Sequence, residues 1–294
     1  MILNTFGEHI WLRKGCAMQF KIVSDSSCDI HSLPGVDFVS VPLHIVTEEA
    51  DYVDDQTLDA EAMVEALLRY KGKSSTACPN VDDWTSAFGD AEYVFALTIT
   101  SALSGSHNAA VCAARSYEEE HPGRRVHVID TLSTGPEMVL LMEKLRKLMD
   151  QGLDFDQTVA AITAYQKKTK LLFLLSSIQN LARNGRASRI GAEAVGLLGI
   201  RIYGQASGEG KLDILGKCRG ESMALKHLLQ QMEHLNWRGG PVRIAHCLNT
   251  AAAQRLRSLL LDKFPQADIS IHPTGGLCSF YAEKGGIMVG FETA

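Results

Sequence analysis

The chain lacks the long hydrophobic runs and the dense basic stretches that mark membrane-spanning and nucleic-acid-binding proteins. Across 294 residues, no segment supplies the roughly 18 consecutive apolar residues that a membrane-spanning helix needs. The net charge is −5 at pH 7, and lysine and arginine are not concentrated in any run. We therefore expect a soluble protein without a transmembrane segment, whose main partner is neither nucleic acid nor an anionic membrane.

Paired cysteines are also missing. The seven cysteines are odd in number, widely spaced and free of any CxxC motif. Disulfide scaffolds and cysteine-rich zinc sites usually show such pairs, so the pattern favours reduced thiols and a cytoplasmic location. It predicts no metal site.

Common catalytic and nucleotide-binding motifs do not occur. No GxGxxG follows a strand, and neither HExxH nor GxSxG is found. The tripeptide Gly72-Lys73-Ser74 resembles the end of a phosphate-binding loop, but Leu67 stands where that motif requires glycine. We therefore expect no cofactor. A hydrolase triad built from distant residues stays open, because triads are defined by geometry and not by order in the chain.

Helical and strand-forming patterns alternate, which is typical of α/β architecture. The chain is longer than one hydrophobic core usually supports, so we expect two domains. The hairpin-like segment IRIYGQASGEGKLDIL (200–215) predicts a mixed sheet in the second half. We place an N-terminal extension at 1–17, which does not resemble a secretory signal, an N-terminal domain at 18–165 and a C-terminal domain at 166–294.

Individual elements follow from the apolar spacing. In the N-terminal half we predict strands at 20–24, 36–44, 93–100 and 125–129, and helices at 56–70, 105–119 and 137–149. In the C-terminal half we predict helices at 155–167 and 222–235, an apolar run at 194–200, and strands at 171–175, 242–246, 268–272 and 287–291, beside the hairpin.

Three predicted strands end in small hydroxyl and acidic residues. YVFALTIT leads into Ser101, Ser104 and Gly105, and the other two lead into the runs 24–27 and 130–134. Ser104 is a candidate N-cap, and the amides after it are free to bind an anion. Carboxyl ends of parallel strands meet at one sheet edge, which is the usual ligand position in open α/β folds. Each junction alone is also compatible with an ordinary helix cap.

Five segments, in order, resemble the motifs of the DegV family of bacterial fatty-acid-binding proteins. They are KIVSDSSCDI, STACPN with Thr76, ITSALSGSHNAA (99–110), LARNGRAS (181–188) and GKCRGESMALKHL (216–228). The resemblance runs from about Met18 to the C-terminus. It implies two α/β domains, a three-layer N-terminal domain with a parallel sheet and a C-terminal domain with a mixed sheet.

The resemblance also implies a function. A single long-chain fatty acid would lie between the domains, and its carboxylate would be presented to a separate ATP-dependent fatty acid kinase subunit that makes acyl phosphate for phospholipid synthesis. The protein itself would not be an enzyme. The alternative is a phosphotransferase or hydrolase that uses the strand-end Ser, Thr and Asp residues on a small polar substrate.

By the resemblance, Thr76, Ser104 and Arg186 occupy the family's carboxylate-binding and mouth positions. Hydroxyls and free amides, including that of Gly105, can replace the water that a carboxylate loses, and Arg186 supplies a permanent charge. A local turn for Thr76, a plain cap for Ser104 and a partner contact for Arg186 are the alternatives. At the mouth or facing a partner we expect Arg186, Ser26, Ser101 and His272.

The family carries a histidine in a C-terminal H-x-G-P-G motif, and two residues compete for its place. Counting back from GGIMVGF puts Tyr281 at that position, where its phenol would donate to the carboxylate. The segment HPTGG offers His272 but leaves too long a spacing to the last strand. We prefer Tyr281.

The hydrocarbon tail of a bound fatty acid would require a binding site with apolar walls. We expect them from two runs, and the specific candidates are Leu172, Phe173, Val195 and Leu198, although both runs are also compatible with ordinary core. The sequence departs from the family pattern at two places, which bear on the fatty-acid tail that is preferred and on the identity of the kinase partner. Ala77 stands where the family has Ser, and Arg201-Ile202 replaces the usual Lys-Pro.

Overall fold

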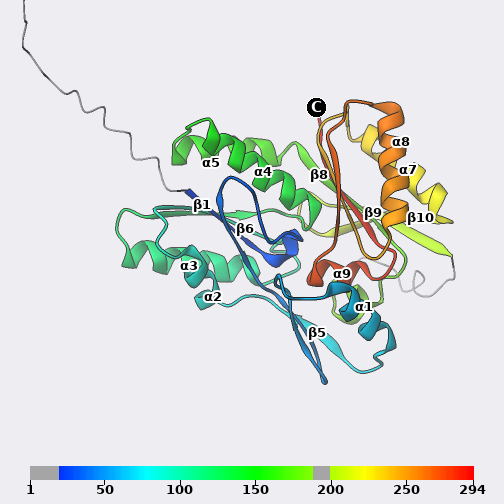
Figure 1. The fold of residues 1–294 in the computed structure, drawn as a ribbon, viewed down its shortest axis with the longest axis horizontal. Helices are drawn as coiled ribbons and strands as arrows, with labels where there is room; N and C mark the ends of the chain where they lie inside the picture. The colour runs from blue at the N-terminus through cyan, green and yellow to red at the C-terminus, as the bar shows by residue number, and fades with distance from the viewer. Residues whose placement is uncertain (1–19, 188–198) are drawn as a thin grey trace, which may run out of the picture.

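In this computed structural model, which describes residues 20–187 and 199–294, the strands form two larger sheets and one small sheet. Figure 1 shows the two larger sheets side by side, with helices packed on their faces, and the small sheet at their junction. The predicted α/β class is confirmed, with a parallel sheet in the N-terminal part and a mixed sheet in the C-terminal part.

The first sheet is fully parallel and has the order β2-β1-β6-β7. Alternate residues of its strands divide between two cores, so the sheet is buried on both faces. Helices α2 and α3 cover one face and α4 and α5 the other, which gives the expected three layers (Figure 1). The bounds are β1 Phe20–Asp25, β2 Asp37–Val41, β6 Tyr93–Thr98, β7 Arg125–Asp130, α2 Val81–Phe88, α3 Ser106–Glu120, α4 Pro136–Asp150 and α5 Phe155–Gln166.

The second sheet has the order β10-β9-β8-β13-β11-β12 and is mixed, because β11 and β12 pair in parallel and the other neighbours are antiparallel. The predicted hairpin is β9 and β10. Helices α7 and α8 pack on one face. The bounds are β8 Thr169–Leu175, β9 Ile200–Ala206, β10 Leu212–Arg219, β11 Val242–His246, β12 Ile269–Pro273, β13 Ile287–Glu292, α7 Glu221–His234 and α8 Thr250–Lys263.

The predicted strand at 36–44 is confirmed as β2 over Asp37–Val41, but its last part is wrong, because the strand ends before Pro42 and the chain enters a different sheet. Strands β3 (His44–Thr47), β4 (Asp51–Val53) and β5 (Ser74–Ala77) form a small antiparallel sheet of order β4-β3-β5. Helix α1 (Ala60–Arg69) begins later than predicted, where Asp59 caps it. The described part of the chain also contains three short elements: η1 (Ser26–Cys28), α6 (Gln179–Arg183) and α9 (Gly276–Ala282).

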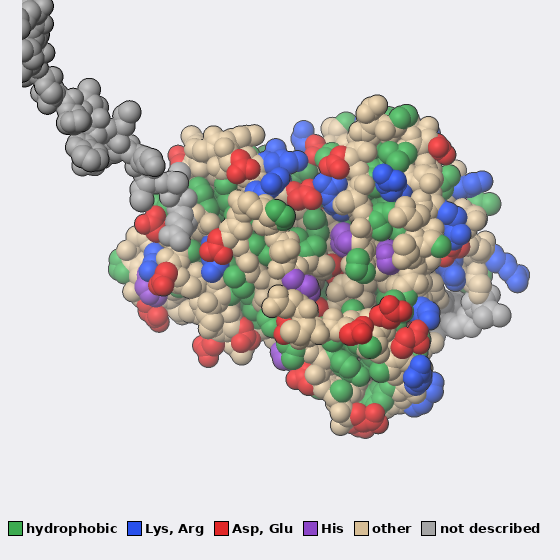
Figure 2. Space-filling view, in the orientation of Figure 1, with side chains coloured by type: hydrophobic (Ala, Val, Ile, Leu, Met, Phe, Trp, Pro, Cys, Tyr) green, Lys and Arg blue, Asp and Glu red, His purple; other side chains and the backbone are tan. Residues whose placement is uncertain are grey.

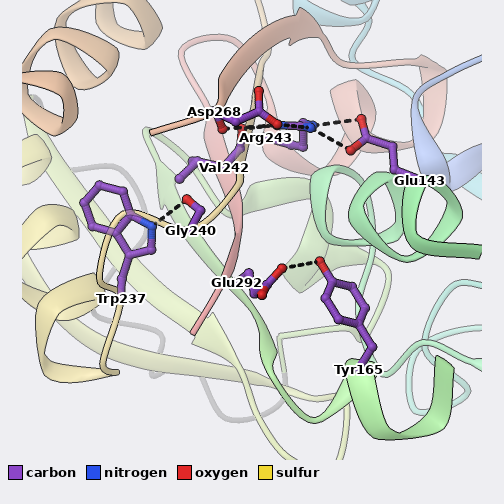
Figure 3. A network of polar contacts seen from close by, with 8 residues as sticks. All are labelled: Glu143, Tyr165, Trp237, Gly240, Val242, Arg243, Asp268 and Glu292. Atoms are coloured by element: carbon purple, nitrogen blue, oxygen red, sulfur yellow. Dashed lines mark hydrogen bonds and ion pairs between the residues drawn. The ribbon is translucent and has the colours of Figure 1, made fainter. Parts of the chain in front are cut away.

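The two halves are tied together through α4 and α5. A Cβ atom placed on Gly290 of β13 would lie 2.5 Å from the backbone of Pro136, so α4 rests directly on the second sheet. Figure 3 shows the polar ties: Arg243 of β11 pairs with Glu143 of α4 at 2.6 Å. The Tyr165 hydroxyl of α5 donates to the carboxylate of Glu292 at 2.8 Å. The first sheet ends with β7 and the second begins with β8, and the helices α4 and α5 between them also contact the second half.

Candidate functional site

A cavity of about 350 Å³ lies between the two halves, where the small sheet, α9, β8 and the start of α3 meet. Most of its walls are apolar, and the few polar groups come from five separate parts of the chain. This combination suits a molecule with a long apolar body and one polar end. The polar lining residues include Thr76, Ser104, Gly105, Arg186 and Tyr281.

Thr76 and Tyr281 bring two hydroxyls together at the cavity wall. Thr76 lies on β5, opposite Ile45 of β3, and Tyr281 lies in the last turn of α9. Their hydroxyl oxygens are 2.8 Å apart and hydrogen-bonded, with either one able to donate. The structure thus unites two residues that are 205 positions apart in the chain.

Ser104 also lines the cavity, but its local role differs from the predicted one. The N-cap of α3 is Gly105, and Ser104 stands one residue earlier. The Ser104 Oγ accepts a hydrogen bond from the amide of Ser106 at 3.2 Å, which leaves its hydroxyl hydrogen available. The helix therefore begins at the cavity wall, with Gly105 lining it, as an anion-binding end requires.

Arg186 lines the same cavity and brings a positive charge to it. Its Nε donates to the carbonyl of Leu103 at 3.3 Å, and its Nη1 donates to the carbonyl of Asn184 at 2.7 Å. Within residues 20–187 and 199–294, no carboxylate forms an ion pair with this guanidinium. Its charge is thus available to an anion in the cavity.

The apolar wall follows the alternation of β8. Leu171, Phe173 and Leu175 point into the cavity. Leu172 points to the opposite face, where it is fully buried against α7 and α8, so its predicted place on the tail wall is wrong. Val195 and Leu198, the other predicted wall residues, lie outside the described residues. Residues that the sequence did not single out complete the wall: Leu43, Ile99, Leu103, Leu212, Leu277 and Met288.

Two of the predicted mouth residues lie elsewhere. Ser26 is only 1% exposed, and its Oγ donates to Asp54 Oδ2 at 2.8 Å while accepting from the amide of Leu43 at 2.9 Å. His272 lies on β12 at the far edge of the second sheet, and burial lowers the pKa of its ring. Neither lines the cavity. These positions contradict the predicted mouth placement, since Ser26 is buried and the partly buried His272 lies on an edge strand that does not line the cavity.

Ser101 lies on the surface in the turn after β6. It is exposed, and its amide donates to Asp130 Oδ1 at 3.1 Å. It does not line the cavity. Its predicted partner-facing role therefore rests on exposure alone.

The acidic strand end at Asp25 is buried beneath the site and does not open into it. Asp25 Oδ2 accepts from the Ile99 amide at 2.9 Å and from the Ser106 hydroxyl at 2.6 Å, and Ser27 donates to Oδ1 at 2.5 Å. Burial raises the pKa of Asp25 to about 6. Asp25 therefore holds the strand ends together and does not line the cavity.

A second hollow beside α1 has the opposite character. Its lining includes Asp55, Asp59, Glu61 and His246. Figure 2 shows acidic side chains gathered on the face over α1. Negative charge repels a carboxylate, so an anionic head group belongs in the first cavity and not in this hollow.

Two further observations limit the chemistry. Within the described part of the chain, no group of three or more His, Cys, Asp or Glu side chains is placed to hold a metal ion. Nor does any helix there have both the length and the apolar character needed to cross a membrane.

The fold and the cavity define an α/β binding protein with a mainly apolar site between two sheets, lined in addition by hydroxyl groups, a helix start and one arginine. The chain belongs to the DegV family, whose model, described as that of an uncharacterised protein, matches residues 19–293. A DegV domain-containing protein of Streptococcus pneumoniae is 46% identical over 279 residues, which cover 94% of this chain and 99% of that protein.

Solved structures show the same fold. The fatty acid kinase B3 protein of Streptococcus pneumoniae, loaded with linoleic acid, is 46% identical with a TM-score of 0.92 over 94% of this chain and 100% of that one. A DegV family protein from Eubacterium eligens, loaded with heptadecanoic acid, is 42% identical with a TM-score of 0.91 over the same shares. Both similar proteins thus carry a fatty acid as ligand.

Proposed function

We propose that this protein is a non-catalytic carrier that binds one long-chain fatty acid in the cavity between its two halves. The observation that supports this best is that Thr76, Ser104, Gly105 and Tyr281 line one mainly apolar cavity, in which the hydroxyls of Thr76 and Tyr281 are hydrogen-bonded to each other. The carboxylate would accept hydrogen bonds from the hydroxyls and from the free amide, each of which replaces a bond to water. The fatty acids carried by the two similar structures support the same ligand class.

The tail would supply most of the binding free energy. Burial contributes about 0.8 kcal/mol per methylene, so a tail of ~16 carbons contributes on the order of 10 kcal/mol before the costs of association. Leu171, Phe173 and Met288 offer that apolar contact. The head-group bonds then fix the orientation and select an acid over a neutral lipid.

We further propose that the carboxylate is presented to a separate ATP-dependent kinase subunit. Arg186 supports this part, since its guanidinium lines the cavity and forms no ion pair with a carboxylate of residues 20–187 and 199–294, so its charge suits either the carboxylate or a phosphoryl group that arrives there. The name of the similar Streptococcus pneumoniae protein, a fatty acid kinase B3 protein, agrees with such a partner.

The ligand is tested by the contents of the purified protein. Organic extraction and mass spectrometry should find about one fatty acid per chain, because an open apolar cavity in water is unfavourable. Repeated recovery of empty protein that also fails to take up palmitate or oleate would contradict the proposal.

Presentation to a kinase is tested with Arg186→Ala. This variant should reduce phosphorylation of the bound fatty acid by a partner kinase more than it reduces fatty-acid affinity, because the charge would act on the incoming phosphoryl group. ATP or ester turnover by the purified carrier alone, abolished by Asp25→Asn or Ser104→Ala, would favour the enzyme alternative instead.

A further inference from the structure

Helix α9 is held at its start by a carboxylate from a distant part of the chain. Asp54, which follows β4 and is 1% exposed, accepts from the amide of Gly276 at 2.6 Å and from the amide of Leu277 at 2.9 Å. These donors lie 222 and 223 residues away in the sequence. The N-cap of α9, Gly275, supplies no side-chain cap of its own. Asp54 thus takes the place of a local capping residue.

A helix of this length depends on such a tie. Helix α9 has seven residues, and isolated helices shorter than about 12 residues are marginal in water. Four of its residues line the cavity, and one of them is Tyr281 in its last turn. The position of the Tyr281 hydroxyl therefore follows the position in which the start of α9 is held.

The same carboxylate is fixed to the small sheet that carries Thr76. The amide of Asp54 donates to the carbonyl of Leu43 at 2.9 Å, just before β3. The Ser26 hydroxyl joins the two, since it donates to Asp54 Oδ2 and accepts from the Leu43 amide. Strand β3 pairs with β5 and places Thr76 opposite Ile45. Asp54 thus links the small sheet, which carries Thr76, to helix α9, which carries Tyr281.

The fit at this link is close. A Cβ atom on Gly276 would lie 2.7 Å from Asp54 Oδ1 and 2.6 Å from Leu58 Cδ2, so only glycine permits this approach. Three donors converge on Asp54, two amides and one hydroxyl, and only a carboxylate offers enough acceptor sites for all of them. An asparagine would place its amide hydrogens against at least one of these donors.

We propose that Asp54 is a positioning residue for the head-group end of the cavity: it holds α9 against the small sheet so that the hydroxyls of Tyr281 and Thr76 converge on the carboxylate of the fatty acid. The inference rests on the proposed function for the identity of the ligand, and on the Asp54 contacts for the positioning itself. Asp54 does not line the cavity, so any effect on affinity must pass through α9 or the small sheet.

A double-mutant cycle tests the proposal. Palmitate affinity is measured by calorimetry for delipidated wild type, Asp54→Asn, Tyr281→Phe and the double variant. Loss of the Tyr281 hydroxyl should weaken binding roughly fivefold, and Asp54→Asn should weaken it by a similar factor. In the Tyr281→Phe background, Asp54→Asn should have less than about twofold further effect, because the hydroxyl that it positions is gone. Equal losses in both backgrounds, or no loss in either, would overturn the proposal.

Two more variants distinguish a specific effect on the position of Tyr281 from a general disturbance of the fold. Gly276→Ala disturbs the same link by steric contact, and it should show the same dependence on Tyr281 if Asp54→Asn does not fold. Asp59→Asn is the matched control, since Asp59 caps α1 through the Ala62 amide at 2.9 Å and makes no bond to α9. It should leave palmitate affinity unchanged. A loss in Asp59→Asn equal to that in Asp54→Asn would show a general effect and overturn the proposal.

A measurement without ligand keeps this inference apart from the proposed function. The ring resonances of Tyr281, labelled with carbon-13, should shift in ligand-free Asp54→Asn and Gly276→Ala and stay unchanged in Asp59→Asn. Unshifted resonances in the first two variants would overturn the positioning role even if the protein binds fatty acid. Failure of wild type to bind any fatty acid, with the shifts present, would overturn only the proposed ligand.

Discussion

At the scale of single residues, the head-group end combines groups of different electrical character. Thr76, Ser104 and Tyr281 offer neutral hydroxyls, and Arg186 adds a permanent charge beside the cavity. The hydroxyls of Thr76 and Tyr281 are hydrogen-bonded to each other, with either one able to donate. A carboxylate that enters must replace this bond, and it can accept from both hydroxyls at once.

Removal of one hydroxyl should therefore weaken binding more than it weakens the fold. A hydrogen bond to a charged group contributes about 1.5 to 3 kcal/mol, so Thr76→Ala and Ser104→Ala should each reduce fatty-acid affinity roughly tenfold or more. Titration of delipidated protein with palmitate measures the effect, and urea unfolding verifies the fold. Ser101→Ala is the matched control, because Ser101 lies near Ser104 but outside the cavity. Unchanged affinity in both cavity variants would place the carboxylate elsewhere.

Tyr281 and His272 allow a second test at this scale. A phenol has an ordinary pKa near 10 and stays neutral at physiological pH, whereas a histidine would gain charge as the pH falls. Tyr281→Phe should weaken binding by about 1 kcal/mol, with little pH dependence between roughly pH 6 and 8, and His272→Gln should be nearly silent. Affinity that steepens with falling pH and loses this slope in His272→Gln would contradict the assignment.

At the scale of single elements, β8 contributes one face to the cavity and the other to the core. Leu172 packs with Leu228, Trp237 and Leu256, while Phe173 faces the cavity. The two residues are adjacent in sequence and equally apolar, so only the pleat of the strand decides which one faces the ligand.

This difference predicts two distinct phenotypes from neighbouring positions. Leu172→Ala should destabilise the protein by roughly 2 to 5 kcal/mol and leave palmitate affinity unchanged, because the void opens on the side of α7 and α8. Phe173→Ala should weaken palmitate binding by at least an order of magnitude, because it removes part of the tail wall. Thermal unfolding and calorimetry on both variants measure the contrast. Equal affinity losses would show that the cavity reaches both faces.

The elements differ in how far the sequence predicts them, and the reason is the range of the interactions that form them. Strand β11 and the hairpin of β9 and β10 are visible in local patterns, and their observed bounds lie close to the predicted ones. The small sheet was missed because β5 is short and polar, with the sequence SSTA, and gains its partners only across the fold. Helix α9 was missed because its cap is Asp54, far away in the chain.

The same reasoning applies to the site residues. Thr76, Ser104 and Tyr281 could be found by family motifs, since each stands at a fixed place in a recognisable segment. Ser26 belongs to such a segment too, but its hydroxyl turns inward to Asp54, which no local pattern reveals. The prediction for Leu172 was wrong for another reason. An unbroken apolar run has no alternation of polar and apolar residues, so it does not indicate which of its side chains face the cavity.

At the scale of the whole molecule, α4 is shared by both sheets and joins the halves into one unit. Gly290→Ala should push α4 away from β13, since the added Cβ would lie 2.5 Å from the backbone of Pro136 and Glu137. Overpacking of this kind costs about 1 to 3 kcal/mol. Urea unfolding should show the loss as one transition that shifts as a whole. Gly208→Ala is the control, because nothing lies within 4 Å of its added Cβ. Two separated transitions in wild type would contradict the shared role of α4.

Because of its buried carboxyl groups, the free energy of unfolding of the whole molecule should fall as the pH rises through the pKa values of these groups. Burial raises the pKa of Asp25 from 3.8 to about 6, and burial also raises the pKa values of Asp29, Asp54 and Glu137. A carboxyl with a raised pKa binds its proton more tightly in the folded protein than in the unfolded chain. Its contribution to stability is therefore complete below the unfolded pKa and is lost as the pH rises through the folded pKa.

For Asp25, this loss falls between about pH 4 and pH 6 and amounts to roughly 3 kcal/mol, from a shift of about two pH units. Asp25→Asn, which has no proton to lose, should flatten the decline of unfolding free energy when urea midpoints are compared at pH 4, 5, 6 and 7. The exposed Asp156 provides a contrast, because its hydrogen bond with Arg125 lowers its pKa and its contribution is lost as the pH falls. Asp156→Asn should therefore leave the decline between pH 4 and 7 in place. An identical slope in wild type and Asp25→Asn would show that Asp25 has no part in it, and that its three hydrogen bonds stabilise the charged form enough to offset burial.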